Sequence, residues 1–309
     1  MKGQITLGSI NIRKFVIEYN QDELNNISSD KINVWNKYIE MGDEKKILIE
    51  RIKKATLPYI IYGVKGTGKT LLVRAVAKEL GWALVEIRCN DSTKERHLFG
   101  SPQLGVINGH DVSYWNAGQL AIAFKGLKIY GKVIIFFDDI GNLPPEIQSM
   151  LLSLFDKRKS IDVAGQIFNV EGEEKLMIVC TSNPPIYAGV NPITEPLMSR
   201  LIGETREYPK PQINKKILDW SGIPIDTVQS PLLTVASTTH DLAVKNHITY
   251  VLSPRDIEQF IEVYNDRHDL DDHMRLVLCI NQTILIKYSD PTEKEEIRIR
   301  CQETFGVDL

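Results

Sequence analysis

The segment GVKGTGKT, residues 63 to 70, has the glycine, lysine and threonine spacing of a loop that binds phosphate groups. Its glycines allow backbone N–H groups to curl around phosphates, Lys69 can reach the terminal phosphates, and the Thr70 hydroxyl can ligate Mg²⁺. The apolar stretch LPYIIYG before it predicts a strand, and a helix is predicted from near Lys69. This strand, loop and helix order is the context in which such a loop binds a nucleotide. The residues predicted to contact the nucleotide are Gly63, Val64, Lys65, Gly66, Thr67, Gly68, Lys69, Thr70 and Leu71.

A second pattern is VIIFFDDI, residues 133 to 140, in which an apolar run ends in Asp138 and Asp139. A run without polar alternation is typical of a strand buried on both faces of a parallel sheet. Two interpretations are open for the carboxylates taken alone: a solvated turn, or a site at the carboxyl end of a strand, where α/β sheets bind ligands. The phosphate loop favours the second, because it needs an acid on a neighbouring strand to hold its metal. We therefore predict that Thr70 and Asp138 ligate Mg²⁺.

Strands and helices alternate along much of the chain. Strands are predicted at 57–63, 83–90, 132–138 and 176–180, and helices from 43 (an amphipathic helix with Ile47, Ile49 and Ile52), from 69, around 118–126 and at 145–156. This alternation indicates βαβ units and a parallel sheet, and beyond about residue 210 helical patterns dominate. The predicted fold is α/β, a P-loop NTPase αβα sandwich with a parallel sheet plus a smaller C-terminal helical lid domain. The expected domains are an N-terminal segment of unassigned structure (1–43), the core (44–209) and the lid (210–309).

The composition of the 309 residues is that of an ordinary globular protein. The net charge of −3 gives no support for binding to nucleic acid, although a pore needs only a few lysines per subunit. The four cysteines are far apart in the sequence and predict buried thiols in a reducing compartment. No apolar run of about 18 residues and no charged, apolar leader is found, so a cytoplasmic location without membrane association is expected.

The order of these motifs resembles the AAA+ ATPases, and within them the MoxR-type group related to dynein and midasin, over about residues 45 to 265. The segment HLFGSPQLGVINGHDVSYWNAGQLAIAF, residues 97 to 124, resembles that group's Leu-Phe-Gly, hairpin insert and glycine ahead of a helix. The resemblance implies that Asn183, in TSNPP, orients the attacking water. It also implies that Arg200, in EPLMSRL, is an arginine finger and that Asn90 is the polar switch that restrains the catalytic acid.

The segment LSPRDIEQFIEVY, residues 252 to 264, resembles the family's sensor-2 motif. Ser253 suits the N-cap of a helix and Pro254 its first position, which places Arg255 in the first turn. The helix dipole disfavours a cation there. An exposed arginine that tolerates this small cost is one interpretation, and an arginine held over the nucleotide phosphates is the other; the resemblance favours the second.

The resemblance implies an ATPase that binds ATP and Mg²⁺ between subunits of a homo-oligomeric ring, expected to be a hexamer. Asp139 and Asn183 would position the water, while Arg255 and Arg200 of a neighbour would stabilise charge on the γ-phosphate. The family normally has glutamate after the metal-binding acid. Asp139 is one methylene shorter, so we predict slow hydrolysis.

The substrate of such a ring is less directly indicated. The resemblance favours a MoxR-type chaperone that remodels or matures a protein partner, with Tyr114 and Trp115 of the hairpin insert at the pore or the partner, or else packed in the core. One alternative is a nucleic-acid motor or the nucleotide-hydrolysing subunit of a DNA-processing or restriction complex. Another is a scaffold that binds ATP but scarcely hydrolyses it.

Overall fold

The computed structural model describes residues 17–34, 38–40, 42–64, 66–107, 110–183, 192–206, 217–219, 222–245 and 247–309. The chain divides into two compact units. The first consists of Met1–Asn36, Lys45–Tyr62 and Thr70–Thr205, and the second of Lys37–Glu44, Gly63–Lys69 and Arg206–Leu309. The phosphate loop is therefore grouped with the C-terminal part of the chain. The domain boundary predicted near residue 210 lies outside the described residues.

Five strands form the central sheet, in the order β10-β2-β9-β6-β3. They are β2 (Tyr59–Gly63), β3 (Ala83–Arg88), β6 (Lys132–Asp138), β9 (Lys175–Ser182) and β10 (Ile202–Arg206). The pairings of β2 with β9, β9 with β6 and β6 with β3 are parallel. The interior strand β6, between β9 and β3, is buried along Val133 to Phe137, which accounts for its unbroken apolar run. The predicted αβα sandwich with a parallel sheet is confirmed.

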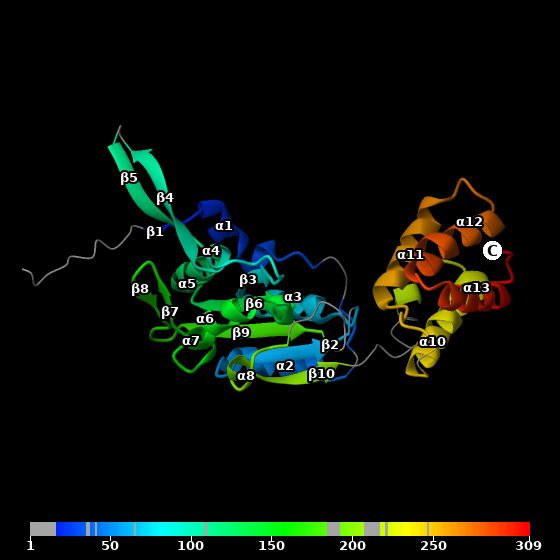
Figure 1. Cartoon of the computed structure of the whole chain (residues 1–309), viewed down its shortest axis with the longest axis horizontal. Helices are drawn as coiled ribbons and strands as arrows, with labels where there is room; N and C mark the ends of the chain where they lie inside the picture. Colours follow the sequence, from blue (N-terminus) through cyan, green and yellow to red (C-terminus); the bar gives the residue numbers. More distant parts are fainter. Residues whose placement is uncertain are drawn as a thin grey trace, which may run out of the picture. The chain divides into compact units, whose positions relative to one another are not determined.

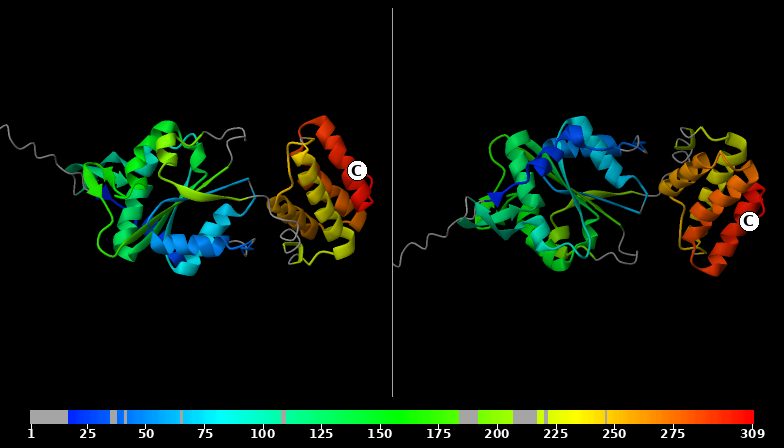
Figure 2. Two further views of the ribbon diagram at one scale, coloured as in Figure 1. Left: turned by 90° about the horizontal axis from the view of Figure 1, so that it is seen from below. Right: turned by 90° about the horizontal axis from the view of Figure 1, so that it is seen from above.

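Helices cover both faces of this sheet. They include α2 (Glu44–Lys54), α3 (Lys69–Leu80), α5 (Gln119–Tyr130), α6 (Pro145–Met150), α7 (Leu152–Phe155) and α8 (Glu195–Met198). Because crossovers between parallel strands are right-handed, α3 covers one face and α5, α6 and α7 cover the other. Figure 2 shows the blue and the green helices on opposite sides of the strands. The single helix predicted at 145–156 is divided into α6 and α7 by a turn at Leu151.

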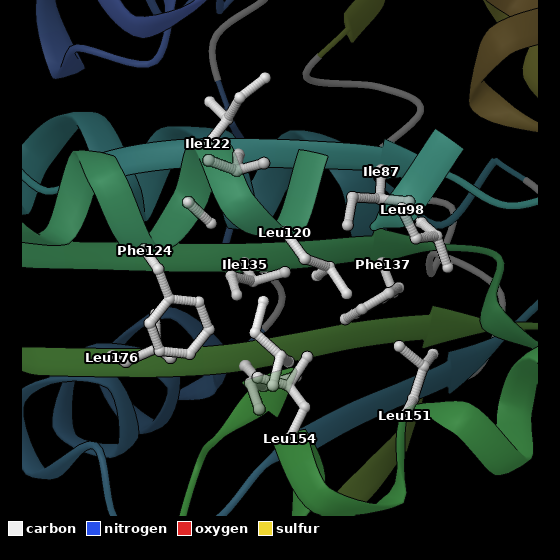
Figure 3. Close-up of a cluster of buried hydrophobic side chains, with 14 of the residues drawn as sticks. Ile87, Leu98, Leu120, Ile122, Phe124, Ile135, Phe137, Leu151, Leu154 and Leu176 are labelled. Carbon is white, nitrogen blue, oxygen red and sulfur yellow. The ribbon is translucent and has the colours of Figure 1, made fainter. Parts of the chain in front are cut away.

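One hydrophobic cluster fills the space between the sheet and α5, α6 and α7 (Figure 3). Its labelled members come from β3 (Ile87), β6 (Ile135 and Phe137), β9 (Leu176), α4 (Leu98), α5 (Leu120, Ile122 and Phe124) and the α6–α7 region (Leu151 and Leu154). The alternate residues of β6 point to the opposite face of the sheet. On α2 the fully buried side chains are Leu48 and Ile52, whereas Ile47 is 39% exposed. Of the three isoleucines of the predicted amphipathic helix, Ile47 therefore does not lie on the buried face, because the buried stripe follows the i, i+4 spacing.

A β-hairpin projects from the first unit (Figure 1). Its strands β4 (Gly100–Ile107) and β5 (His110–Ala117) are antiparallel, and β1 (Ile17–Glu18) pairs with β5. The hairpin predicted in this segment is thus present. At its base, the indole Nε1 of Trp115 donates to the carbonyl oxygen of Phe99 at 3.0 Å, and the ring packs against the core. Trp115 therefore has a packing role, as one of the two interpretations expected.

Shorter elements complete the first unit. They are α1 (Gln21–Asn26), η1 (Ser29–Lys31), α4 (Glu95–Leu98), η2 (Ile140–Asn142), β7 (Ile161–Val163) and β8 (Gln166–Phe168). The four cysteines of the chain are buried and free, in agreement with the predicted thiols.

The C-terminal part of the second unit is helical. It contains η3 (Ile225–Gln229), α10 (Ser230–Val244), α11 (Pro254–Asp266), α12 (Asp272–Cys279), η4 (Ile280–Ile284), η5 (Leu285–Lys287) and α13 (Pro291–Phe305). A separate hydrophobic core, which includes Phe260 of α11, joins these helices, so the predicted C-terminal helical part is confirmed. Among the residues that the structure describes, no helix is both long and apolar enough to span a membrane.

Candidate nucleotide-binding and hydrolysis site

Two neighbouring elements bring Thr70 and Asp138 together. Asp138 is the last residue of β6, and Thr70 lies in the first turn of α3. The Thr70 hydroxyl lies 3.0 Å from Oδ1 and 3.2 Å from Oδ2 of Asp138, so it donates to this carboxylate. Hydroxyl and carboxylate oxygens are the hard ligands that Mg²⁺ takes in nucleotide sites. The donor set therefore fits the metal that the sequence predicts.

Asp139 follows directly and has an unusual backbone. Its φ of 58° and ψ of 54° lie in the left-handed region, which aspartate tolerates better than most residues. The Asn183 amide Nδ2 donates to Asp139 Oδ1 at 3.2 Å, and Asn183 is only 4% exposed. The structure thus brings together the two residues that were predicted to position the attacking water.

Thr181, in β9, links the two acids and was missed by sequence reasoning. Its hydroxyl donates to Asp138 Oδ1 at 2.7 Å and accepts the backbone N–H of Asp139 at 2.9 Å. The side chain is fully buried. A signal was available, since Thr181 lies two residues before Asn183 and alternate residues of a strand face the same side.

Cys89, just after β3, lies beside the acids as well. Its backbone N–H donates to the carbonyl oxygen of Asp138 at 2.9 Å. Burial raises the pKa of the Cys89 thiol, and the nearby carboxylates of Asp138 and Asp139 raise it further. The thiol therefore stays protonated at neutral pH and is unsuited to act as a nucleophile.

The phosphate loop is described apart from Lys65, which lies outside the described residues. The Lys69 ammonium donates to the carbonyl oxygens of Gly63 at 2.7 Å and Val64 at 3.0 Å, and the Thr67 hydroxyl donates to Val64 at 3.0 Å. Lys69 is buried, with 7% exposure. The loop is followed by α3, in which Leu71 is partly buried.

Two glycines of the loop are required by close approaches. Gly66 has a φ of 83°, and a Cβ there would lie 2.5 Å from Cβ of Ser253. A Cβ at Gly63 would lie 2.8 Å from the carbonyl oxygen of Arg206. Since real Cβ atoms do not approach other atoms this closely, both positions exclude any larger residue.

A buried charged cluster adjoins the loop and was also missed. The Arg206 guanidinium donates to the Tyr38 hydroxyl and to the Glu44 carboxylate, and the Tyr38 hydroxyl donates to Glu44 at 2.8 Å. Burial is the main cause that raises the pKa of Tyr38, so its hydroxyl stays neutral. The Tyr38 ring would contact a Cβ at Gly68 at 3.5 Å. No short motif contains these residues, because they come from separate segments of the sequence.

The start of α11 has the predicted form. Ser253 is the N-cap, and its backbone N–H and hydroxyl donate to Asp256 Oδ2 at 2.8 and 2.7 Å. Tyr250 and Lys287 also bond to this buried carboxylate, at 3.1 and 3.2 Å. Arg255 is exposed in the first turn, and no hydrogen bond or ion pair of its guanidinium occurs within the described part of the chain.

Two other predicted residues make local contacts instead. Arg200, just beyond α8, donates from Nη1 to the carbonyl oxygen of Pro196, and its Nε has no hydrogen-bond partner among the described residues. The Asn90 side-chain oxygen accepts the backbone N–H of Ser92 at 3.0 Å and its hydroxyl at 2.6 Å. The Asn90 side chain is thus bonded within its own turn, to Ser92.

Residues 58–201 match the family model described as the AAA domain of the dynein-related subfamily. This segment is therefore similar to the AAA domains of that subfamily. The phosphate loop and the strands β2, β3, β6 and β9 lie within this segment, and β10 follows it directly. The resemblance to the MoxR-type AAA+ group is confirmed. Such a domain implies nucleotide binding.

Several curated proteins are similar to the chain. Protein CbbQ of Hydrogenophilus thermoluteolus is 25% identical, over 59% of this chain and 64% of CbbQ. Midasin of Giardia intestinalis is 31% identical, over 41% of this chain and 2% of midasin. The aerobic cobaltochelatase subunit CobS of Sinorhizobium is 20% identical, over 81% of this chain and 76% of CobS. The chain spans about half to two thirds of the length of the first curated relatives it matches.

Proposed function

We propose that this chain is a MoxR-type AAA+ ATPase that couples Mg·ATP hydrolysis, in a homo-oligomeric ring expected to be a hexamer, to the remodelling or maturation of a protein partner. The observation that carries the proposal is the hydroxyl of Thr70 bonded to the carboxylate of Asp138. Thr70 is the last residue of the phosphate loop, and Asp138 is the last residue of β6, an interior strand of the sheet. Phosphate binding and metal binding therefore fall at consecutive residues, Lys69 and Thr70.

Each residue then has a role in binding or in hydrolysis. The Lys69 ammonium exchanges its bonds to the Gly63 and Val64 carbonyl groups for the terminal phosphates. Thr70 and Asp138 hold Mg²⁺, which when bound neutralises charge on the phosphate oxygens.

Asp139, oriented by Asn183, accepts a proton from the attacking water. Arg255, and Arg200 of a neighbouring subunit, stabilise the negative charge that develops on the γ-phosphate.

A protein partner is favoured over nucleic acid by two observations. The net charge is −3, so the chain as a whole has no excess of positive charge to attract a phosphate backbone. The β4–β5 hairpin carries Leu104 with 82% exposure, which leaves an apolar side chain open to contact with a protein partner. In addition, one similar protein is named as a subunit of a cobaltochelatase. This name is consistent with a chain that acts as part of a larger protein assembly.

The test is phosphate release from ATP by the full chain, with and without Mg²⁺ and with single- or double-stranded DNA. We expect Mg²⁺-dependent turnover that DNA leaves unchanged, and its loss in Lys69→Ala. Because Lys69 is buried, circular dichroism must show that the variant is folded.

Lys294→Ala is the matched control, since Lys294 is an exposed lysine of α13. It should hydrolyse ATP at the parent rate. Parental turnover in Lys69→Ala would refute the phosphate-site assignment. Turnover that requires DNA would support the nucleic-acid motor in place of the protein remodeller.

A further inference from the structure

Thr181 is the residue that contacts both candidate acids, through a single hydroxyl group. The hydroxyl donates to Asp138 Oδ1 at 2.7 Å and accepts the backbone N–H of Asp139 at 2.9 Å. A threonine hydroxyl has one proton to donate and lone pairs to accept. Its donation to Asp138 therefore leaves the oxygen lone pairs available for Asp139, and the two bonds support each other.

The environment of Thr181 makes these bonds important. The side chain is fully buried, between buried residues of β9. A buried carboxylate oxygen or N–H group that loses its partner carries a desolvation penalty. Thr70 also donates to Asp138 but is itself a predicted metal ligand. Among the described residues, Thr181 is then the side-chain donor that remains for Asp138.

The second bond acts on the backbone. Asp139 has the left-handed conformation, which is unfavourable for residues other than glycine unless other contacts maintain it. The bond from its N–H to Thr181 is one such contact. By fixing the backbone of Asp139, it sets the position from which the Asp139 carboxylate reaches Asn183. The direction of the Asp139 side chain therefore depends on the Thr181 hydroxyl.

We propose that Thr181 is a positioning residue for both acids: it orients the Asp138 carboxylate toward the metal and holds the backbone of Asp139 so that its carboxylate meets Asn183. The inference rests on the proposed Mg·ATP hydrolysis. It adds a residue that has no role in the motif set from which the function was inferred.

The test compares Thr181→Val, which keeps the shape and removes the hydroxyl, with Thr181→Ser, which keeps the hydroxyl. The readouts are kcat, KM for ATP at saturating Mg²⁺, and the Mg²⁺ concentration that gives half-maximal binding of a non-hydrolysable ATP analogue. We expect Thr181→Val to lower kcat and to raise that Mg²⁺ concentration by about tenfold or more each, as loss of a hydrogen bond to a charged group predicts. KM should change by less than about threefold, and Thr181→Ser should restore both affected quantities to within about threefold of the parent.

Thr283→Val is the matched control. Thr283 is also buried, and its hydroxyl donates to the carbonyl oxygen of Cys279 within the helical part of the second unit. This variant should leave kcat and the Mg²⁺ dependence unchanged. If Thr181→Val does not fold, Thr181→Ser against Thr181→Ala tests the hydroxyl without the methyl group.

Two results would overturn the inference alone while ATP hydrolysis stands. One is parental kcat and Mg²⁺ dependence in Thr181→Val. The other is a Thr181→Ser variant as impaired as Thr181→Val, which would assign the effect to packing. A parent chain that binds no ATP would instead overturn the proposed function, and this inference with it.

Discussion

At the scale of single residues, Asp139 combines a shortened side chain with a left-handed backbone. We predict that Asp139→Asn lowers kcat by about tenfold or more, because a general base contributes roughly 10² to 10⁴ in rate. Asparagine also tolerates the left-handed region, so the fold and ATP affinity should survive. Asp139→Glu moves the carboxylate by about 1 Å toward the family's usual position and should raise kcat. Phosphate release and binding of an ATP analogue measure the two effects.

The stability of the variants provides the control for this prediction. Glutamate is less tolerant than aspartate or asparagine of a positive φ, so Asp139→Glu should unfold at a lower temperature than Asp139→Asn. Hydrolysis at the parent rate by Asp139→Asn would exclude Asp139 as the base and would favour an acid from elsewhere or a scaffold that scarcely turns over.

The residues of the site were predictable to the extent that they lie in short motifs. Asp138 ends an apolar strand, and Thr70 ends the glycine-rich loop after another strand. Parallel strands have their carboxyl ends at one edge of the sheet, so the sequence motifs alone predicted that the two residues lie close together. Arg206 and Glu44 belong to no motif. Their contact depends on which distant segments pack together, which neither local spacing nor propensity determines.

At the scale of elements, Lys159 joins α2 to β9. Its buried ammonium donates to the carbonyl oxygens of Ala55, just after α2, and Leu176, in β9. Burial lowers the pKa of Lys159 to about 8, whereas an unfolded chain has about 10.4. Between these values the unfolded state binds more protons, so the free energy of unfolding should rise as the pH increases from about 8 to about 10.4.

Chemical denaturation across this pH range measures that slope. Lys159→Met keeps the aliphatic stem and removes the titrating group, so it should flatten the slope contributed by this residue. Lys157→Met is the control, because Lys157 is exposed nearby in the same turn and should retain the parent's profile. A Lys159→Met profile identical to that of the parent would contradict the role assigned to burial.

Elements were predicted best where the pattern is long and regular. The strands β6 and β9 and the start of α11 lie close to their predicted positions, because apolar runs and the Ser-Pro cap are strong local signals. The division of the helix at Leu151 was not foreseen. Its cause is tertiary, since Leu151 and the residues around it pack into the core below the sheet.

At the scale of the whole molecule, an active site shared between subunits would make turnover depend on assembly. Arg200 lies beyond a four-residue helix and donates to the carbonyl oxygen of Pro196 in its own turn. Its Nε has no hydrogen-bond partner in the described part of the chain. Because Nε is buried and Nη1 bonds within its own turn, action on a neighbouring subunit would require the guanidinium to turn away from Pro196. An arginine supplied in this way can raise turnover by about 10³ to 10⁵.

Mixing two inactive variants tests this arrangement. Arg200→Ala and Lys69→Ala should each be inactive alone, whereas an interface that joins the intact Lys69 of one chain to the intact Arg200 of the next regains both groups. In a ring with head-to-tail interfaces assembled from equal amounts, about a quarter of the interfaces are of this kind, so turnover should recover to about a quarter of the parental value.

The chain that carries both substitutions is the control, because its mixtures with either single variant form no such interface. Co-assembly must be shown with differently tagged chains. If the co-assembled single variants remain inactive at every ratio, Arg200 does not act across the subunit interface, and the charge on the γ-phosphate must be stabilised within one chain.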